Sequence, residues 1–163
     1  MPEPIQDSDR DEIREFITEH WHAPHICIRD KLYYPHQAEA FIERRDGKIA
    51  ALVTYEQQGD AILMITQNSI EPGAGIGASL VLKVIEEARK RKVRRIWLTT
   101  TNDNLKSMGF YQRMGFRLVA VHRDAVTHGR QDFKPEVPET GQNGLPIYDE
   151  IEMELILQPS IPS

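Results

Sequence analysis

The spacing of apolar residues alternates along the chain between a helical and a strand-like period, and these changes predict the order of the elements. Between residues 75 and 92, apolar positions recur every three to four residues, the period of an amphipathic helix with one buried face. Between residues 40 and 67, the apolar runs are short, partly β-branched and separated by Asp-Gly or Gly-Asp, which is typical of strands joined by turns. The same reasoning predicts helices over residues 7–21, 75–92 and 102–114, three strands within 40–67, and single strands over 94–100, 116–123 and 147–157.

Residues 124–146, between the last two predicted strands, are rich in proline and glycine and carry no clear period. Loops of this length are usually functional or disordered. We therefore expect a loop here that closes over a substrate. We expect residues 158–163 to form a frayed tail, which leaves 1–157 as a single domain.

Composition and charge restrict the class of protein. The chain has 163 residues, enough for one domain with a sizeable core, and its formal net charge of −5 argues against general nucleic-acid binding. No apolar run approaches the roughly 18 residues that a membrane span needs, and the acidic N-terminal segment does not look like a secretory signal. Cys27 is the only cysteine, so the chain cannot form an internal disulfide, which is consistent with a reducing cytoplasm. We therefore expect a cytoplasmic protein without a membrane or nucleic-acid partner.

Three alternating glycines, Gly73, Gly75 and Gly77, lie between a predicted strand and a predicted helix. This arrangement presents free backbone N–H groups at a helix N-terminus, where phosphate binds, and glycine lets the anion approach the backbone. A plain tight turn is the alternative, but one glycine would satisfy it. Residues 73–78 also fit the dinucleotide-binding fingerprint formally. The preceding strands read as hairpins, however, and the next strand ends in threonines rather than an acidic residue.

A longer stretch, "PGAGIGASLVLKVIEEARKRKVRRIWLTTTNDNLKSMGFYQRMGFRLV", resembles the core of the GNAT superfamily of N-acetyltransferases. The glycine segment occupies the place of the family motif that opens the central helix. Asn104, Tyr111 and Gly115-Phe116 follow with the spacing of the second family motif. Pro72 departs from the Gln or Arg that usually begins the first motif. The resemblance implies an α/β fold with a mixed, mostly antiparallel sheet, helices on both faces, and the glycine loop where two central strands diverge.

The resemblance also implies site residues and a co-substrate, acetyl-CoA, with no metal. Asn104 would hydrogen-bond the pantetheine arm, and Tyr111 would act as general acid for the departing thiolate. The residues whose N–H groups would hold the pyrophosphate are Gly73, Ala74, Gly75, Ile76, Gly77 and Ala78. Taken alone, an aromatic residue in the position of Tyr111 is most often a core residue, and Asn104 would be read as a helix cap; only the motif favours the functional roles.

The predicted reaction is acetyl transfer from acetyl-CoA to a primary amine of a small molecule or a protein, with a homodimer possible. From residue 131 onward the chain has seven acidic residues and one basic residue, Lys134, which favours a cationic acceptor. A non-catalytic acyl-CoA sensor of the same fold and a dinucleotide-binding module remain alternatives. Glu71, Glu56 and Gln67-Asn68 are candidates for the general base, and none stands out.

Residues 20–34 are the other unusual stretch, because they combine three histidines, a cysteine and three large aromatic residues. Trp21, Tyr33 and Tyr34 are candidates for substrate contact, with plain packing as the alternative. The spacing of the histidines and the cysteine matches no standard zinc site, so we expect no metal here.

Overall fold

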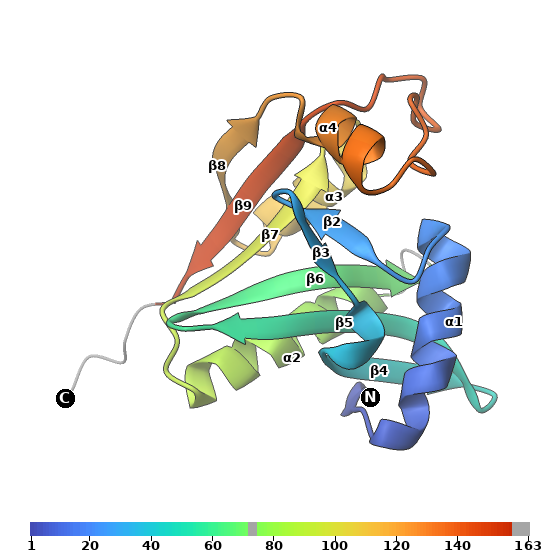
Figure 1. Cartoon of the computed structure of the whole chain (residues 1–163). Helices are drawn as coiled ribbons and strands as arrows, with labels where there is room; N and C mark the ends of the chain where they lie inside the picture. The colour runs from blue at the N-terminus through green and yellow to red at the C-terminus, as the bar shows by residue number, and fades with distance from the viewer. Residues whose placement is uncertain (72–74, 158–163) are drawn as a thin grey trace.

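A computed structural model describes residues 1–71 and 75–157. A seven-stranded sheet forms its centre, with α1 and the β2–β3 hairpin on one face and α2 on the other (Figure 1). The strand order is β1-β4-β5-β6-β7-β9-β8, and all neighbours are antiparallel except β6 and β7. The expected mixed, mostly antiparallel α/β fold is confirmed. The elements are β1 (Glu3–Pro4), η1 (Asp7–Asp9), α1 (Arg10–Trp21), β2 (Ile26–Ile28), β3 (Lys31–Tyr33), η2 (Pro35–Gln37), β4 (Glu39–Arg45), β5 (Lys48–Gln58), β6 (Ala61–Ser69), α2 (Ile76–Lys90), β7 (Arg95–Thr101), α3 (Leu105–Arg113), β8 (Arg117–His122), α4 (Ala125–Asp132) and β9 (Glu150–Ile156).

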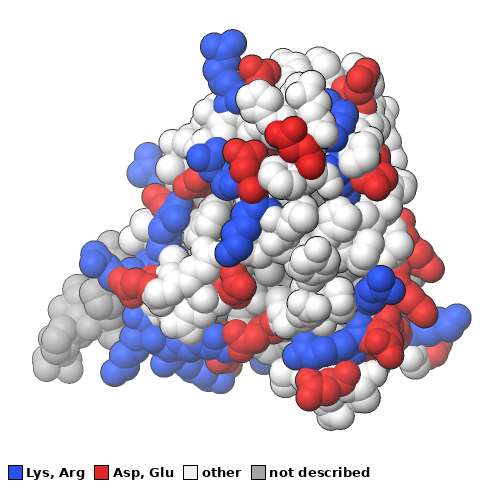
Figure 2. Space-filling model, in the orientation of Figure 1, with Lys and Arg blue, Asp and Glu red and all other residues white. Residues whose placement is uncertain are grey.

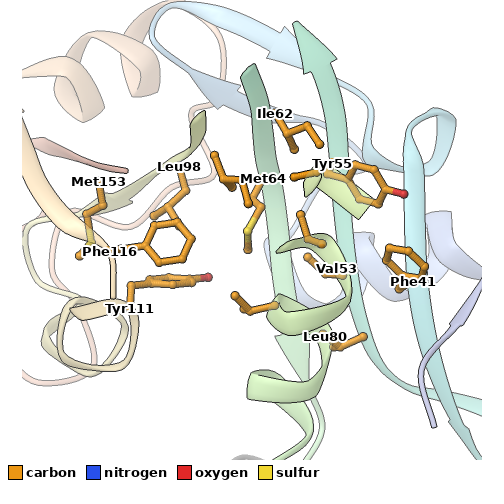
Figure 3. Close-up of a cluster of buried hydrophobic side chains, with 14 of the residues drawn as sticks. Phe41, Val53, Tyr55, Ile62, Met64, Leu80, Leu98, Tyr111, Phe116 and Met153 are labelled. Atoms are coloured by element: carbon orange, nitrogen blue, oxygen red, sulfur yellow. The ribbon is translucent and has the colours of Figure 1, made fainter. Parts of the chain in front are cut away.

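The sheet is buried on both faces at its centre, which explains the long apolar run of β5. Leu52 packs with the buried face of α1, whereas its neighbour Val53 packs with the buried face of α2. Figure 3 shows the α2 side of this core, where Val53 and Leu80 lie between Tyr111 and Phe41. The two apolar faces of the helices thus hold the sheet in a three-layer arrangement.

Strands β6 and β7 separate from one another along their length. They pair in parallel only over Ala61–Leu63 and Arg95–Trp97, and among the described residues no further pair joins them as β6 continues to Ser69 and β7 to Thr101. The divergence therefore lies next to the segment that leads into α2, as expected. The strands that precede the glycines form antiparallel pairs, as expected, but β6, α2 and β7 then form a short parallel crossover that was not predicted from the sequence.

A β-bulge in β6 changes the face to which its later residues point. The register of β5 and β6 skips Ile65. Met64 before the bulge and Gln67 after it both face α2, although strict alternation would place them on opposite faces. Asn68 points the other way, and its Oδ1 accepts a 2.7 Å hydrogen bond from Trp21 Nε1. The bulge therefore directs polar side chains to both faces at the point where the strands diverge.

The segment 124–146, expected to be a loop, contains the helix α4, and this expectation was wrong in that respect. The helix is short, and only Val126 and Gly129 are buried, so its sequence shows too little periodicity to be recognised. Arg130 holds the following turn in place: its guanidinium donates to the carbonyl oxygens of Val137, Pro138 and Ile147, each at 2.8 Å. The β2–β3 hairpin was not predicted either, since each strand has only three residues.

Candidate active site

A groove of about 880 Å³ runs between β6, the N-terminal end of α2 and α3. Its walls include Gln67 from β6, Gly77 from α2, and Tyr111 from α3. Two cations, Lys106 and Arg113, lie along the α3 side of the groove. The groove therefore combines free helical amides, cations and an aromatic wall, a suitable lining for a long anionic ligand.

Helix α2 begins at a glycine with a left-handed backbone. Gly75 has φ 77°, a conformation that favours glycine. The first intrahelical bond runs from the Ser79 N–H to the Gly75 carbonyl at 3.2 Å. The N–H groups of Ile76, Gly77 and Ala78 precede that bond, so they are the donors that a helix leaves for an anion. Gly73 and Ala74, also predicted to bind the cofactor, lie outside the described residues.

Tyr111, the predicted catalytic residue, lies at the base of this groove and is only 8% exposed. Its hydroxyl donates a 2.6 Å hydrogen bond to Gln67 Oε1, and Gln67 Nε2 donates at 2.9 Å to the Gly77 carbonyl oxygen. Figure 3 shows its ring beside Phe116, and the two rings meet edge to face at 5.5 Å. Burial raises the pKa of Tyr111 well above that of a free phenol. The side chain thus belongs both to the core and to the groove.

A second pocket, of about 290 Å³, lies on the opposite face of the sheet, beneath α4 and the β2–β3 hairpin. Much of its wall is apolar, with Trp21 from α1 and Ile26 from β2 among the contributors. On β6, Ile65 lines the pocket and Gln67, two residues later, lines the groove. At the start of α3, Asn104 lines the pocket and the next residue, Leu105, lines the groove. The two hollows therefore approach one another between β6 and the start of α3, where the sheet is open.

Glu150 is the acidic residue of β9 that reaches the pocket, and sequence reasoning did not identify it. Its side chain is 5% exposed, and its carboxylate accepts the Arg29 backbone N–H at 3.2 Å. Burial raises the pKa of Glu150, and the Arg29 N–H partly opposes this shift. The sequence does contain one signal, the alternation of β9, which places Glu150, Glu152 and Glu154 on the same face. Glu152 and Glu154 bind Arg95, whereas Glu150, at the other end of the strand pair, does not. A buried carboxylate with a raised pKa is suited to accept a proton.

The other predicted residues divide between the two hollows and the rest of the molecule. Asn104 caps α3, because its Oδ1 accepts the Ser107 N–H at 3.2 Å, and it also lines the pocket. Trp21 lines the pocket, whereas Tyr33 lies in the core and Tyr34 is exposed outside it. Among the residues named as possible bases, Gln67, Asn68 and Glu71 line the groove, where Asn68 accepts from Trp21 and the carboxylate of Glu71 pairs with Arg45. Glu56 lines neither hollow and accepts from Gln58.

Among residues 1–71 and 75–157, no group of three or more histidine, cysteine, aspartate or glutamate side chains is placed to hold a metal ion. None of the helices in this part of the chain has the length and apolar character that crossing a membrane would require. Acidic and basic side chains are interspersed on the face shown in Figure 2, with no broad area of a single sign.

The strand divergence thus has the groove and a helix N-terminus on one face of the sheet and the pocket on the other. Comparisons with known proteins identify the family of this chain. Residues 4–116 match the family model described as the acetyltransferase (GNAT) family. The chain therefore belongs to the GNAT family, and the predicted acetyl-CoA-dependent acyltransferase is confirmed at the level of the family.

Individual relatives span most of the chain. The uncharacterized protein YxbD of Bacillus subtilis is 34% identical over 143 residues, which cover 87% of this chain and 89% of the relative. The ribosomal protein bS18-alanine N-acetyltransferase of Escherichia coli is 25% identical over 111 residues, 63% of this chain and 74% of the relative. An IAA acetyltransferase from Bacillus cereus has a similar structure, with a TM-score of 0.74, 18% identity, and coverage of 96% of this chain and 99% of that one. At that identity, the structural similarity establishes the fold.

Proposed function

We propose that this protein transfers an acetyl group from acetyl-CoA to a primary amine, with the cofactor in the groove and the amine in the pocket. The approach of the two hollows between β6 and α3 is the observation that carries this proposal. The pyrophosphate would lie at the N-terminus of α2, against the amides of residues 73–78. The pantetheine arm would pass along β6 toward Asn104, and the thioester would reach the opening in the sheet.

Lys106 and Arg113 support the placement of the cofactor, because both line the groove and can approach its phosphate groups. An acetyltransferase of Bacillus subtilis with the same fold, at a TM-score of 0.68 and 17% identity, was crystallised in complex with CoA. The amine acceptor of this chain is a separate question, since the bS18-alanine N-acetyltransferase named above acts on a protein. The small volume of the pocket favours a small molecule.

The proposed reaction is a direct attack of the amine on the thioester. The nitrogen lone pair forms the new C–N bond, and the C–S bond breaks as the tetrahedral intermediate collapses. The nitrogen loses a proton to Glu150, directly or through water, and the thiolate leaves with a proton from Tyr111. The products are the N-acetylated amine and CoA with a free thiol, so no redox partner is needed.

The two assigned residues have different support. Glu150 lies in the acceptor pocket, and its raised pKa makes it a better base than an exposed carboxylate. Tyr111 is held by Gln67, so its hydroxyl would have to leave Gln67 Oε1 to reach the sulfur. Its raised pKa keeps the phenol protonated near neutral pH, as a donor requires, but makes complete proton transfer more difficult.

The proposal is tested by cofactor binding and by thiol release. We expect CoA and acetyl-CoA to raise the melting temperature, by an amount that grows with the logarithm of their concentration relative to Kd, and NADH at the same concentration to leave it unchanged. We also expect release of free CoA thiol when acetyl-CoA is mixed with one member of a panel of primary amines. Binding of CoA without thiol release from any amine would favour the acyl-CoA sensor, and stabilisation by NADH alone would favour the dinucleotide-binding module.

A further inference from the structure

The only basic residue after position 130, Lys134, lines the acceptor pocket. It is 4% exposed, and its ammonium lies 5.8 Å from the centre of the Trp21 ring. The ion pairs among the described residues do not include Lys134. Burial lowers its pKa, which the exposed Glu136 opposes only in part. A buried lysine held over an aromatic ring without a carboxylate partner is costly unless something else pairs with it.

Lys134 and Glu150 line the same pocket but do not pair with each other. Neither contributes to the pKa shift of the other, whereas the thiol of Cys27 is close enough to both for its own pKa to be affected by them. The pocket therefore has a buried cation and a buried anion at separate places in a largely apolar wall. Another cation at this site, Arg130, is already bonded to three backbone carbonyls and is not free for a ligand.

Three of the seven acidic residues that suggested a cationic acceptor are engaged elsewhere. Glu152 and Glu154 both bind Arg95, and Asp149 accepts the Asp124 N–H at 2.7 Å. A polyamine entering the pocket would meet one carboxylate and also the ammonium of Lys134. A ligand that carries an amine and a carboxylate would pair with both buried charges.

We propose that the acceptor is a free amino acid with an apolar side chain, bound with its amine toward Glu150 and its carboxylate toward Lys134. This inference rests on the proposed acetyltransferase function and specifies its substrate class. The volume of about 290 Å³ suits one such molecule, and Trp21, Ile26 and Ile65 offer apolar surface for its side chain. A lysine side chain within a protein or a chain N-terminus lacks the adjacent carboxylate and would leave Lys134 unpaired.

The first experiment measures thiol release from acetyl-CoA with the twenty common L-amino acids, their C-terminal amides, spermidine and a tetrapeptide with a free N-terminus. We expect the fastest turnover with an apolar amino acid. The amine of an amino-acid amide has a different pKa from that of the free amino acid, so their wild-type rates cannot be compared directly. The decisive quantity is the change in kcat/KM that a variant causes for the acid, compared with the change that it causes for the amide.

The second experiment compares Lys134→Met with Lys134→Arg, and uses Lys31→Met as a matched control. Lys31 also lies over an aromatic ring, 5.0 Å from the centre of Tyr33, but it is exposed and outside the pocket. We expect Lys134→Met to reduce kcat/KM for the amino acid about 30-fold or more and to change that for its amide by less than about threefold. Lys134→Arg should recover part of the loss for the acid, and Lys31→Met should behave as the wild type.

The outcomes separate this inference from the function on which it rests. Thiol release that is fastest with spermidine or the tetrapeptide, or an equal loss on acid and amide in Lys134→Met, would reject the amino-acid acceptor and leave the acetyltransferase standing. No thiol release with any amine would reject the acetyltransferase itself. The melting temperature and CoA binding of each variant exclude misfolding. If Lys134→Met is unstable, Lys134→Gln, which also removes the charge, takes its place with the same expected difference between acid and amide.

Discussion

Replacing Tyr111 with phenylalanine tests whether its hydroxyl takes part in the reaction or only supports the groove. The substitution removes the 2.6 Å hydrogen bond to Gln67 Oε1, an atom of a half-buried side chain that lines the groove. Losing an ordinary hydrogen bond of this kind costs about 0.5–1.5 kcal/mol. In a domain of this size each kcal/mol corresponds to roughly 2–4 °C, so we expect the melting temperature to fall by about 1–6 °C.

The expected kinetic effect is much larger than the effect on stability. A general acid contributes about 10²–10⁴-fold, so kcat should fall by that factor while the Kd for CoA changes by less than about threefold. The assay is thiol release at saturating acetyl-CoA, with CoA binding measured separately by calorimetry. Tyr55→Phe is the matched control, because Tyr55 is a buried tyrosine of the same core, stacked on Phe41 and outside the groove.

Gln67→Leu distinguishes a catalytic phenol from a positioning one. If Tyr111 acts only by holding Gln67 against the Gly77 carbonyl, Gln67→Leu should lower kcat as much as Tyr111→Phe does, and the double variant should lower it no further. If Tyr111 donates the proton, Tyr111→Phe should be far more damaging than Gln67→Leu. An unchanged kcat in Tyr111→Phe, with normal CoA binding, would refute the assignment of Tyr111 altogether.

Three further predictions concern the base and the glycines of the groove. Glu150→Gln should lower kcat/KM by about 10²–10⁴-fold at neutral pH. The pKa of Glu150 is higher in the folded than in the unfolded chain, so its contribution to wild-type stability should be lost as the pH rises from about 4.5 through the raised value. Over that range, the melting temperature of Glu150→Gln should therefore rise relative to that of the wild type. Gly77→Ala should reduce the stabilisation by CoA, since its Cβ would lie 3.0 Å from Gln67 Nε2, an atom engaged in a hydrogen bond. Gly109→Ala should instead raise the melting temperature of the free protein by about 1–4 °C, because alanine favours the helix. The new Cβ would meet only the movable guanidinium of Arg113, at 3.2 Å. A fall in melting temperature would contradict this prediction.

Much of the frame that holds the cofactor groove could be read from the sequence, because the signals are local. The period of 75–92 predicted α2, the alternating glycines predicted its exposed N-terminus, and Asn104 with Gly115 marked the ends of α3. Each of these depends on residues within a few positions of one another, and local propensity or capping decides them. The prediction that Tyr111 lies in the groove also followed from its motif, although its bond to Gln67 did not.

The acceptor pocket was not predictable in the same way, because its charged residues come from distant parts of the chain. Glu150 accepts the Arg29 N–H, 121 positions away in sequence, and Lys134, which follows α4 in the segment predicted to be a loop, lies over the ring of Trp21. Nor does any local pattern place the β-bulge at Ile65 that turns Gln67 toward α2. By itself, the sequence determined the family, the order of the longer helices and strands, and the amides offered to a phosphate, since these follow from short-range periodicity and motif spacing. Only the tertiary structure decided which buried charges share a pocket, because strand pairing and packing bring those side chains together, and their burial is the largest cause of their shifted pKa values.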